Sequence, residues 1–548
     1  MKKFCFLFLL LIPAAIAVSQ EALVSQTEQY YDFLALQGKV ERPTLNYRTL
    51  SDSIWNIEPG VTHIWQENNL GKTHRFFNVI DTRIYGPELF MSVNTAAPYG
   101  QNDGALWQGK GFNSSLTAGV RFEAYGIEAT FKPQISFSQN LSFDYMKPNY
   151  SGANYTDKAE MYGYYGVSSI DAPQRFGDEP FFTFDWGDSE IRYSWKTLTV
   201  GFGTQPIWLG PAQINPIIHS NNAASYPKLD IGLRKQSIDF LGIHWGDIET
   251  RAWWGYLSES DYFDNDSSND HNLITGFSIA YGVPFLPGLT IGLNRIMLSK
   301  WDNMDASDIF TLLWPFMDTG AGSDESDQRA SIVLDYLLPA AGLNIYLEWG
   351  RNDFSPSLDY VLRYPFHTAG YTIGIKKSLN ISDRFKGEIL LEVTSLECSQ
   401  DYDRLISWSS TFYAHHIITQ GHTNRGQWLG AGIGTGGNSQ YIGFKLYYPK
   451  GYGQIFFQRR NPDLDYTMFI DSKAYPEDFK NNIFVAERNI RLLLDFGISG
   501  LYYITENLSV FGQFVFEDEH NPLYNGKSNG DSTHRFNCSF SARVKYSF

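Results

Sequence analysis

Residues 535–548, RFNCSFSARVKYSF, decide the class of fold. Apolar or aromatic side chains occupy every second position from Phe536 to Phe548, and the positions between them, from Arg535 to Ser547, are polar or charged. Successive side chains of a strand point to opposite faces, so this period of two predicts a strand with one apolar and one polar face. Because arginine and lysine lie on the polar face, that face does not belong to a dry core.

The same alternation recurs through most of the chain, for example over 118–125, 127–137 and 343–350. About 18 such segments follow residue 75, an even number within the range of outer-membrane barrels. They are predicted near 76–95, 114–125, 127–139, 187–195, 197–206, 236–246, 248–258, 272–283, 288–299, 329–338, 342–352, 367–379, 384–397, 437–449, 452–461, 487–503, 507–519 and 533–548. The sequence therefore predicts an all-β fold.

The connections between these segments alternate in length along the chain. Tight turns, such as 125–126 and 246–247, alternate with long loops, such as 96–113 and 207–235. Short turns at one end and long loops at the other are typical of a transmembrane β-barrel, with the short turns in the periplasm. A soluble sandwich or propeller does not sort its connections in this way. We expect residues 75–548 to form an antiparallel barrel in the bacterial outer membrane.

The N-terminal residues read as an export signal followed by a small helical element. Lys2 and Lys3 precede an apolar run, and small residues around Ala17 fit a cleavage site, so residues 1–17 are predicted to be a signal peptide. The apolar run is too short to span a bilayer. We expect a helix over 21–37, within a helical and irregular periplasmic element that covers residues 18–74.

Composition agrees with this class of protein. The chain contains 40 Phe, 34 Tyr and 14 Trp, and barrels place such rings in girdles at both membrane interfaces. The formal net charge of -16 argues against nucleic acid as a partner. Only Cys398 and Cys538 follow the predicted signal peptide, so a disulfide framework is not expected.

The loop at residues 96–113, AAPYGQNDGALWQGKGFN, combines turn-forming residues with aromatic and polar side chains. Aromatic rings such as those of Tyr99 and Trp107 can stack on the apolar face of a sugar, while amide and ammonium groups bind its hydroxyls. A solvated connection without a ligand is the alternative interpretation. The loop is therefore a candidate carbohydrate platform.

Three stretches resemble the Wzi family of capsule assembly proteins, with Bacteroidetes-type members the most similar. These are NDGALWQGKG at 102–111, GTQPIWLGP at 203–211 followed by NNA at 221–223, and the histidine-containing segment 415–430. The resemblance implies an outer-membrane barrel with a small periplasmic helical element. It also implies a lectin-like protein that binds capsular or other surface polysaccharide and helps to assemble or retain it at the cell surface. It implies no catalytic mechanism.

We predict that two of the long loops gather polysaccharide-binding residues at the extracellular end. These are Tyr99, Asn102, Asp103, Trp107, Gln108, Lys110, Gln205 and Trp208. The two tryptophans would stack on sugars, the amides would bind hydroxyls, and Lys110 would attract acidic groups. The alternative is that these residues brace the loops against the barrel wall. Expected partners are the polysaccharide, outer-membrane lipid and other components of the capsule export machinery.

The long loop at 140–186 is rich in tyrosine, including Tyr150, Tyr164 and Tyr165. Exposed rings gain nothing from bulk water, so we predict that this loop folds over or into the barrel and occludes it. An open barrel of this size would instead be a diffusion channel, or porin, which is the main functional alternative.

Other constellations in the sequence favour simpler interpretations. A barrel enzyme acting on lipid or glycan would need a carboxylate pair, and loop acids such as Asp103 and Glu88 offer no distinct pair. His415, His416 and His422 have no acidic or cysteine partner at ligand spacing. The acidic loop at 264–270 lacks the glycine and glutamate of a calcium loop. The sequence therefore predicts no enzyme activity, no cofactor and no metal ligand.

Overall fold

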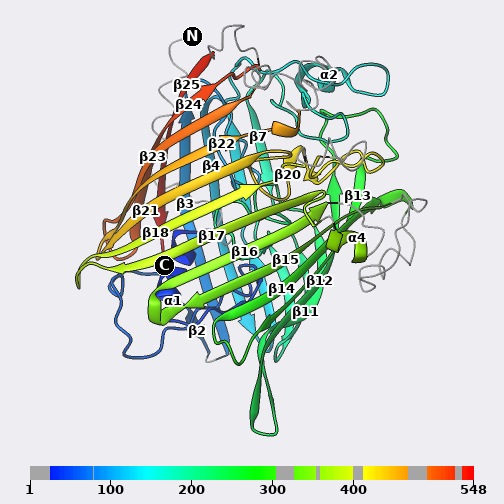
Figure 1. Cartoon of the computed structure of the whole chain (residues 1–548). Helices are drawn as coiled ribbons and strands as arrows, with labels where there is room; N and C mark the ends of the chain where they lie inside the picture. Colours follow the sequence, from blue (N-terminus) through cyan, green and yellow to red (C-terminus); the bar gives the residue numbers. More distant parts are fainter. Residues whose placement is uncertain are drawn as a thin grey trace.

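The computed structural model describes residues 25–77, 79–303, 326–352, 358–363, 365–398, 411–466, 490–524 and 533–548. The strands within these residues form a closed antiparallel barrel of 18 strands (Figure 1). The barrel closes where the last strand pairs with the first long one, with Ser539 opposite Asn94. The predicted fold class is confirmed. The predicted signal peptide, residues 1–17, lies outside the described residues.

The described part of the barrel wall consists of twenty strand segments. In chain order they are β3 (Ile80–Asn94), β4 (Gly111–Ala124), β5 (Ile127–Phe131), β6 (Gln134–Ser138), β7 (Phe181–Asp185), β8 (Glu190–Trp195), β9 (Leu198–Gly203), β11 (Lys228–Phe240), β12 (Ile243–Ser258), β13 (His271–Gly282), β14 (Leu289–Lys300), β15 (Ser326–Leu338), β16 (Leu343–Asn352), β17 (Ala369–Asn380), β18 (Lys386–Ser395), β21 (Asn438–Tyr448), β22 (Gly451–Asn461), β23 (Leu492–Tyr503), β24 (Leu508–His520) and β25 (His534–Tyr546). Segments β5 and β6 both pair with β4 and together make one wall strand, interrupted at Pro133, which lacks a backbone N–H. Segments β7 and β8 make the next wall strand in the same way. Short β2 (His74–Phe76) pairs with the start of β3.

Two predicted boundaries are wrong. The strand predicted at 236–246 is β11, at Lys228–Phe240, and its turn lies at Leu241 and Gly242 instead of 246–247. Both turn residues have positive φ, 55° and 75°, the geometry of a two-residue hairpin turn, and a leucine provides no sequence signal for it. Strand β7 falls within the loop predicted at 140–186, but it belongs to the wall.

The two faces of the wall follow the alternation read from the sequence. On β25, Phe536 and Phe540 are about half exposed on the outer face, at 59% and 51%, whereas Asn537 and Ser539 are buried on the inner face. Arg121 and Arg192 are likewise fully buried inside the barrel. An apolar outer face with a polar interior is the arrangement of a barrel in lipid. No helix among the described residues is long and apolar enough to span a membrane.

The tight turns and the long loops lie at opposite ends of the barrel. In Figure 1 the hairpin of β11 and β12 projects below, and α2 (Asp157–Tyr162) lies among the long loops at the top. Helix α4 (Leu358–Arg363) and the small hairpin of β19 (Thr423–Asn424) and β20 (Gln427–Trp428) belong to the loop end. The short 3-10 turns η1 (Trp301–Asn303) and η2 (Pro339–Ala341) each extend a wall strand.

Helix α1 (Gln26–Leu36) packs against the inner wall at the end with the short turns (Figure 1). It begins where the Ser25 hydroxyl accepts a hydrogen bond from the Glu28 backbone N–H at 3.1 Å. The ring of Phe33 stacks on Tyr447 of β21 with 4.3 Å between centroids, and Tyr30 stacks on Trp65 at 4.0 Å. These aromatic contacts hold the helix in the barrel mouth.

Candidate functional site

The chain that follows α1 runs into the barrel and is held there by a wall carboxylate. The side chain of Glu249 on β12 accepts hydrogen bonds from the backbone N–H groups of Leu45, Asn46 and Tyr47 at 2.8, 2.9 and 2.7 Å. The Asn46 side chain donates to Asn294 on the wall at 2.6 Å. Hydrogen bonds to a charged group are strong, so the segment is fixed inside the lumen.

The long loop at 204–227 enters the lumen from the opposite end in the same manner. The Glu392 carboxylate accepts from the backbone N–H groups of Gln213 and Asn215 at 2.7 and 2.8 Å. The Glu348 carboxylate accepts from the N–H of Ile217 at 2.9 Å. Wall carboxylates therefore satisfy the backbone of both segments that fill the lumen.

These two segments meet inside the barrel. Strand β1 (Tyr47–Arg48) pairs antiparallel with β10 (Trp208–Leu209), with Tyr47 opposite Leu209 and Arg48 opposite Trp208. Shortly after β1, Asp52 binds the Arg234 guanidinium at 2.7 Å and also contacts Arg251. Paired backbone and ionic contacts between described residues thus cross the lumen.

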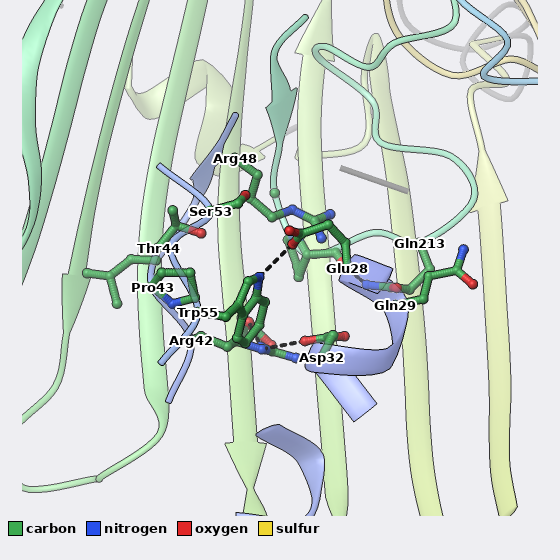
Figure 2. A pocket seen from close by; sticks show the side chains of 14 residues that line it. Glu28, Gln29, Asp32, Arg42, Pro43, Thr44, Arg48, Ser53, Trp55 and Gln213 are labelled. Carbon is green, nitrogen blue, oxygen red and sulfur yellow. Dashed lines mark hydrogen bonds and ion pairs between the residues drawn. The ribbon is translucent and has the colours of Figure 1, made fainter. Parts of the chain in front are cut away.

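A small cavity remains between α1, residues 42–55 and the tip of the 204–227 loop (Figure 2). The groups around it are paired with one another. The Trp55 indole donates to the Glu28 carboxylate at 2.7 Å, and Arg42 binds Asp32 and Asp335, each at 2.7 Å. We interpret this cavity as part of the plug, because Glu28, Asp32, Arg42 and Asp335 already have partners inside the chain.

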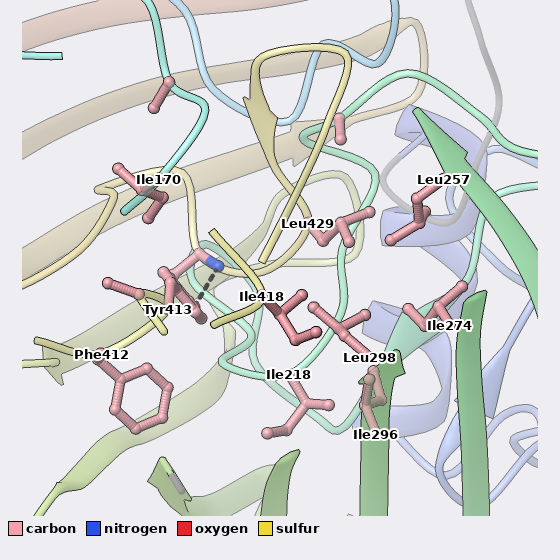
Figure 3. Packing of buried hydrophobic residues seen from close by; sticks show 14 of the residues in the cluster. Ile170, Ile218, Leu257, Ile274, Ile296, Leu298, Phe412, Tyr413, Ile418 and Leu429 are labelled. Carbon is pink, nitrogen blue, oxygen red and sulfur yellow. Dashed lines mark hydrogen bonds between the residues drawn. The ribbon is translucent and has the colours of Figure 1, made fainter. Parts of the chain in front are cut away.

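The loops at the other end form a common cap with a hydrophobic centre. Tyr150, Tyr164 and Tyr165 of the 140–180 loop are buried in it with residues of the 204–227 and 411–436 loops. Figure 3 shows Ile170, Ile218, Tyr413 and Leu429 of these loops packed above Ile296 and Leu298 of the wall. The hydroxyls of Tyr164 and Tyr165 both donate to the Asp463 carboxylate. The tyrosine-rich loop therefore folds over the barrel, as the sequence predicted.

Within the first loop, most of the predicted binding residues support the loop itself. Trp107 packs edge-on against Phe176 of the 140–180 loop, with 5.0 Å between centroids. The Gln108 side chain accepts from the Ser92 hydroxyl at 2.6 Å. The Tyr99 ring lies 5.6 Å from the Arg460 guanidinium on the inner wall. Lys110 lies at the barrel rim, where its backbone carbonyl accepts from the Leu141 N–H at 2.9 Å.

The two predicted residues of the 204–227 loop lie inside the lumen, away from the first loop's surface. Trp208 is 1% exposed, donates to the Ala212 carbonyl at 3.0 Å and lies under the Arg48 guanidinium. Gln205 is also buried and accepts from the Ser51 hydroxyl at 3.2 Å. The structure therefore does not bring Trp107 and Trp208 together as paired stacking faces, because the 204–227 loop folds inward to meet β1.

Three loops do converge at one junction on the cap. The Asn102 backbone N–H donates to the Asn222 side chain at 3.0 Å, and the Asn222 amide donates to the Trp428 carbonyl at 3.2 Å. A Cβ at Gly432 would lie 3.2 Å from the Gln101 Cβ, so these segments touch. We call Gln101, Asn102, Asn221, Asn222 and Trp428 the loop junction.

Several amide atoms of the loop junction are buried without a partner. Gln101 Nε2, Asn102 Oδ1 and Asn221 Oδ1 make no hydrogen bond to any described residue. Asn102 and Asn221 line a small cavity together with Asp103 and with the inner-wall side chains of Ser115, Gln134 and Arg543. Buried polar atoms normally bind protein, water or ligand, so these atoms make the loop junction a candidate for polar ligand recognition.

Asp103 faces the same cavity, and its charge state depends on its burial. Burial raises the pKa of Asp103 to about 7, against the opposing effect of a hydrogen bond with Gln108. The carboxyl group is therefore largely protonated below neutral pH, when it can donate a hydrogen bond as well as accept one.

The histidines singled out in the sequence have structural contacts. His415 Nδ1 accepts from the Ile418 N–H at 3.1 Å, and His422 Nε2 lies 2.7 Å from the Ile218 carbonyl. His416 is exposed. These contacts match the predicted loop-packing role.

Sequence reasoning missed Trp428 and the side chain of Asn222 as members of one site. Asn222 and Trp428 each lie within a stretch that resembles the family, which was a signal, but nothing local links the two residues. The link is a long-range contact between the 204–227 loop and the 411–436 loop.

A family model described as capsule assembly protein Wzi matches residues 90–454. The chain belongs to the Wzi family. The match confirms the predicted family. Together with the apolar outer face of the barrel, it also confirms the predicted location in the outer membrane. No curated protein matches the chain.

Among solved structures, Escherichia coli Wzi is similar over 97% of this chain and 100% of that chain, with 12% identity and a TM-score of 0.59. That protein is described as an outer membrane protein involved in group 1 capsule assembly and as a carbohydrate-binding β-barrel. At this identity the likeness shows the shared fold. Acinetobacter baumannii OccAB2 is 11% identical over 85% of this chain and 98% of that chain, with a TM-score of 0.37. Pseudomonas aeruginosa OpdK with vanillate is 8% identical over 86% of this chain and 100% of that chain, also with a TM-score of 0.37.

Proposed function

We propose that this chain binds capsular or other surface polysaccharide at its loop end and helps to assemble or retain it at the cell surface. Membership of the Wzi family and the likeness to a barrel described as carbohydrate-binding support this proposal. The observation that carries it is the meeting of β1 and β10 inside the lumen under a cap of interlocked loops. A barrel filled in this way is a rigid platform for a ligand and a poor diffusion channel.

We propose the loop junction as the place of binding. The unpartnered atoms of Gln101, Asn102 and Asn221 would bind sugar hydroxyls, and the half-buried Trp428 would offer a ring for stacking. Among the residues predicted from the sequence, Asn102 belongs to this site directly and Lys110 would attract acidic groups at the rim. The remaining six, Tyr99, Asp103, Trp107, Gln108, Gln205 and Trp208, would act by holding the loops in place.

The protein acts, in this proposal, by binding and without catalysis. Residues 1–17 would direct export and be removed. The apolar outer face would contact outer-membrane lipid, and the periplasmic end would meet other components of the capsule export machinery. Residues 18–74 would then serve as the plug of the periplasmic mouth.

The experiment that tests this function compares ligand binding with conductance in one preparation. Purified protein is applied to a glycan array that includes acidic capsular polysaccharides, and the same protein is inserted into planar bilayers. We expect saturable binding to a subset of glycans and no large steady conductance. Open-channel conductance without glycan binding would contradict this function and indicate a porin instead.

A further inference from the structure

The last hairpin of the barrel carries three side chains with metal-binding chemistry on its outer face. His520, the last residue of β24, pairs in register with His534, the first residue of β25. Asp518 lies two residues before His520 and therefore points to the same face. Glu517 and Glu519, which alternate with them, are buried on the inner face.

The three side chains are already close to one another. One oxygen of the Asp518 carboxylate lies 2.8 Å from His534 Nδ1, and the other lies 3.3 Å from His520 Nε2. The two imidazole rings have 4.2 Å between centroids. Among the described residues, this is the one group of three or more His, Cys, Asp or Glu side chains whose ligand atoms all lie within 4.8 Å of one another.

We propose that Asp518, His520 and His534 bind a divalent transition-metal ion, Zn²⁺ in the first instance. Two imidazole nitrogens and one carboxylate oxygen are a donor set that Zn²⁺ and its neighbours accept. Each donor would have to lie about 2.0–2.2 Å from the ion, and the ligand atoms already lie within 4.8 Å of one another. The ion would lie between the Asp518 carboxylate and the two rings, and it would bind each ring through a deprotonated nitrogen.

The position of the group favours an ion over a purely internal ion pair. The side chains of Asp518, His520 and His534 are 22%, 26% and 38% exposed, so a metal ion can enter from outside and keep water at its open positions. Asp518 lies between Leu494 on β23 and Phe536 on β25 in the sheet register. These apolar neighbours limit water around the carboxylate and strengthen its attraction for a cation. Both strands are part of the closed wall, so the ligands are held on rigid backbone.

Nothing in the sequence alone points to this site, since the ligands come from two strands joined by the long connection at 521–533. His520 and His534 become neighbours only when the register of the hairpin is known. The site lies on the outer wall and is separate from the loop junction, so the proposal does not depend on polysaccharide binding.

The test is a metal titration of the mature protein, purified in detergent with a tag that contains no histidine. Zn²⁺ binding is measured by calorimetry, and Co²⁺ is added separately so that its visible absorption reports the ligand geometry. We expect one Zn²⁺ per chain, with affinity lowered more than about tenfold in His534→Ala and in Asp518→Asn. The matched control is His244→Ala, since His244 forms a 3.0 Å pair with Asp239 at the opposite end of the barrel and should not affect binding.

Two outcomes would overturn the proposal. The first is that the wild-type protein takes up no Zn²⁺. The second is that His534→Ala, Asp518→Asn and His244→Ala all bind Zn²⁺ as the wild type does. Assembly of each variant is checked by its heat-dependent migration on a gel. If His534→Ala does not assemble, His534→Gln takes its place, because glutamine keeps the size and polarity of the side chain but is a poor zinc ligand.

Discussion

Tyr47 of the N-terminal segment and Leu209 of the 204–227 loop lie opposite each other in a two-stranded sheet inside the barrel. One segment enters from the end with short turns and the other from the end with long loops. Each is tied to the wall by carboxylates that accept backbone N–H groups. The plug is therefore shared between the two ends, and the loop cap rests on it.

Loss of one wall carboxylate should loosen this plug. In Glu249→Ala the N–H groups of Leu45, Asn46 and Tyr47 lose their acceptor, at a cost of about 3 kcal/mol or more to the packed state of the segment. We expect transient channel openings in planar bilayers where the wild type shows none. Asp247→Ala is the control, because Asp247 lies on the same strand but bonds the Ser237 hydroxyl. Identical traces for Glu249→Ala and Asp247→Ala would contradict a plug held in this way.

Trp107 should act as a brace between two loops. Trp107→Ala removes the contact with Phe176 and should cost up to about 3–5 kcal/mol in local stability of the 140–180 loop. Hydrogen exchange should then become faster in that loop and stay slow in the wall strands, and Trp107→Phe should restore much of the protection. If hydrogen exchange in the 140–180 loop is the same in Trp107→Ala as in the wild type, the bracing role is contradicted.

The cap should become less stable as pH rises from about 4 to 7. Burial raises the pKa of Asp103 from 3.8 to about 7, so in this interval the packed loop holds a proton that the opened loop releases. The packed state binds more protons, and its stability therefore falls with pH across the interval and levels off above it. Hydrogen exchange of residues 96–110, corrected for intrinsic rates, measures this slope.

The variant Asp103→Asn distinguishes the contribution of Asp103 to this pH dependence from the contributions of other acidic residues in the cap. Burial also raises the pKa of Asp171 and of Asp463 to about 6, which produces a slope of the same sign. We expect the variant to retain part of the pH dependence and to be more protected than the wild type at pH 8. An unchanged slope would show that Asp103 does not titrate in the packed loop.

The wall of the barrel could be predicted because its cause is local. Period-two alternation and the spacing of turns are properties of neighbouring residues. The alternation is required because the outer face of each strand contacts lipid. The error at β11 came from a turn at Leu241 and Gly242, whose leucine provides no turn signal. The tyrosines of the 140–180 loop also led to a valid prediction, because so many rings require burial.

The interior of the candidate site could not be predicted in the same way. The sequence pattern places Gln205 and Trp208 at the surface, but their loop turns inward because Glu348 and Glu392 accept its backbone N–H groups. Nothing in the sequence says which backbone a wall carboxylate will bind. The pairing of Asn222 with Trp428, and of His520 with His534, depends in the same way on the finished fold.

The most direct test of the central claim is retention of polysaccharide on cells that express Trp428→Ala. Wild type, Trp428→Ala and Trp301→Ala are produced at equal surface levels, and cell-bound and released capsular polysaccharide are quantified. Trp301 is the control, because it is a partly exposed tryptophan at the loop end that packs on Tyr256 away from the loop junction. We predict that Trp428→Ala releases polysaccharide into the medium while Trp301→Ala retains it. Equal retention by all three, with the barrel assembled, would contradict binding at the loop junction.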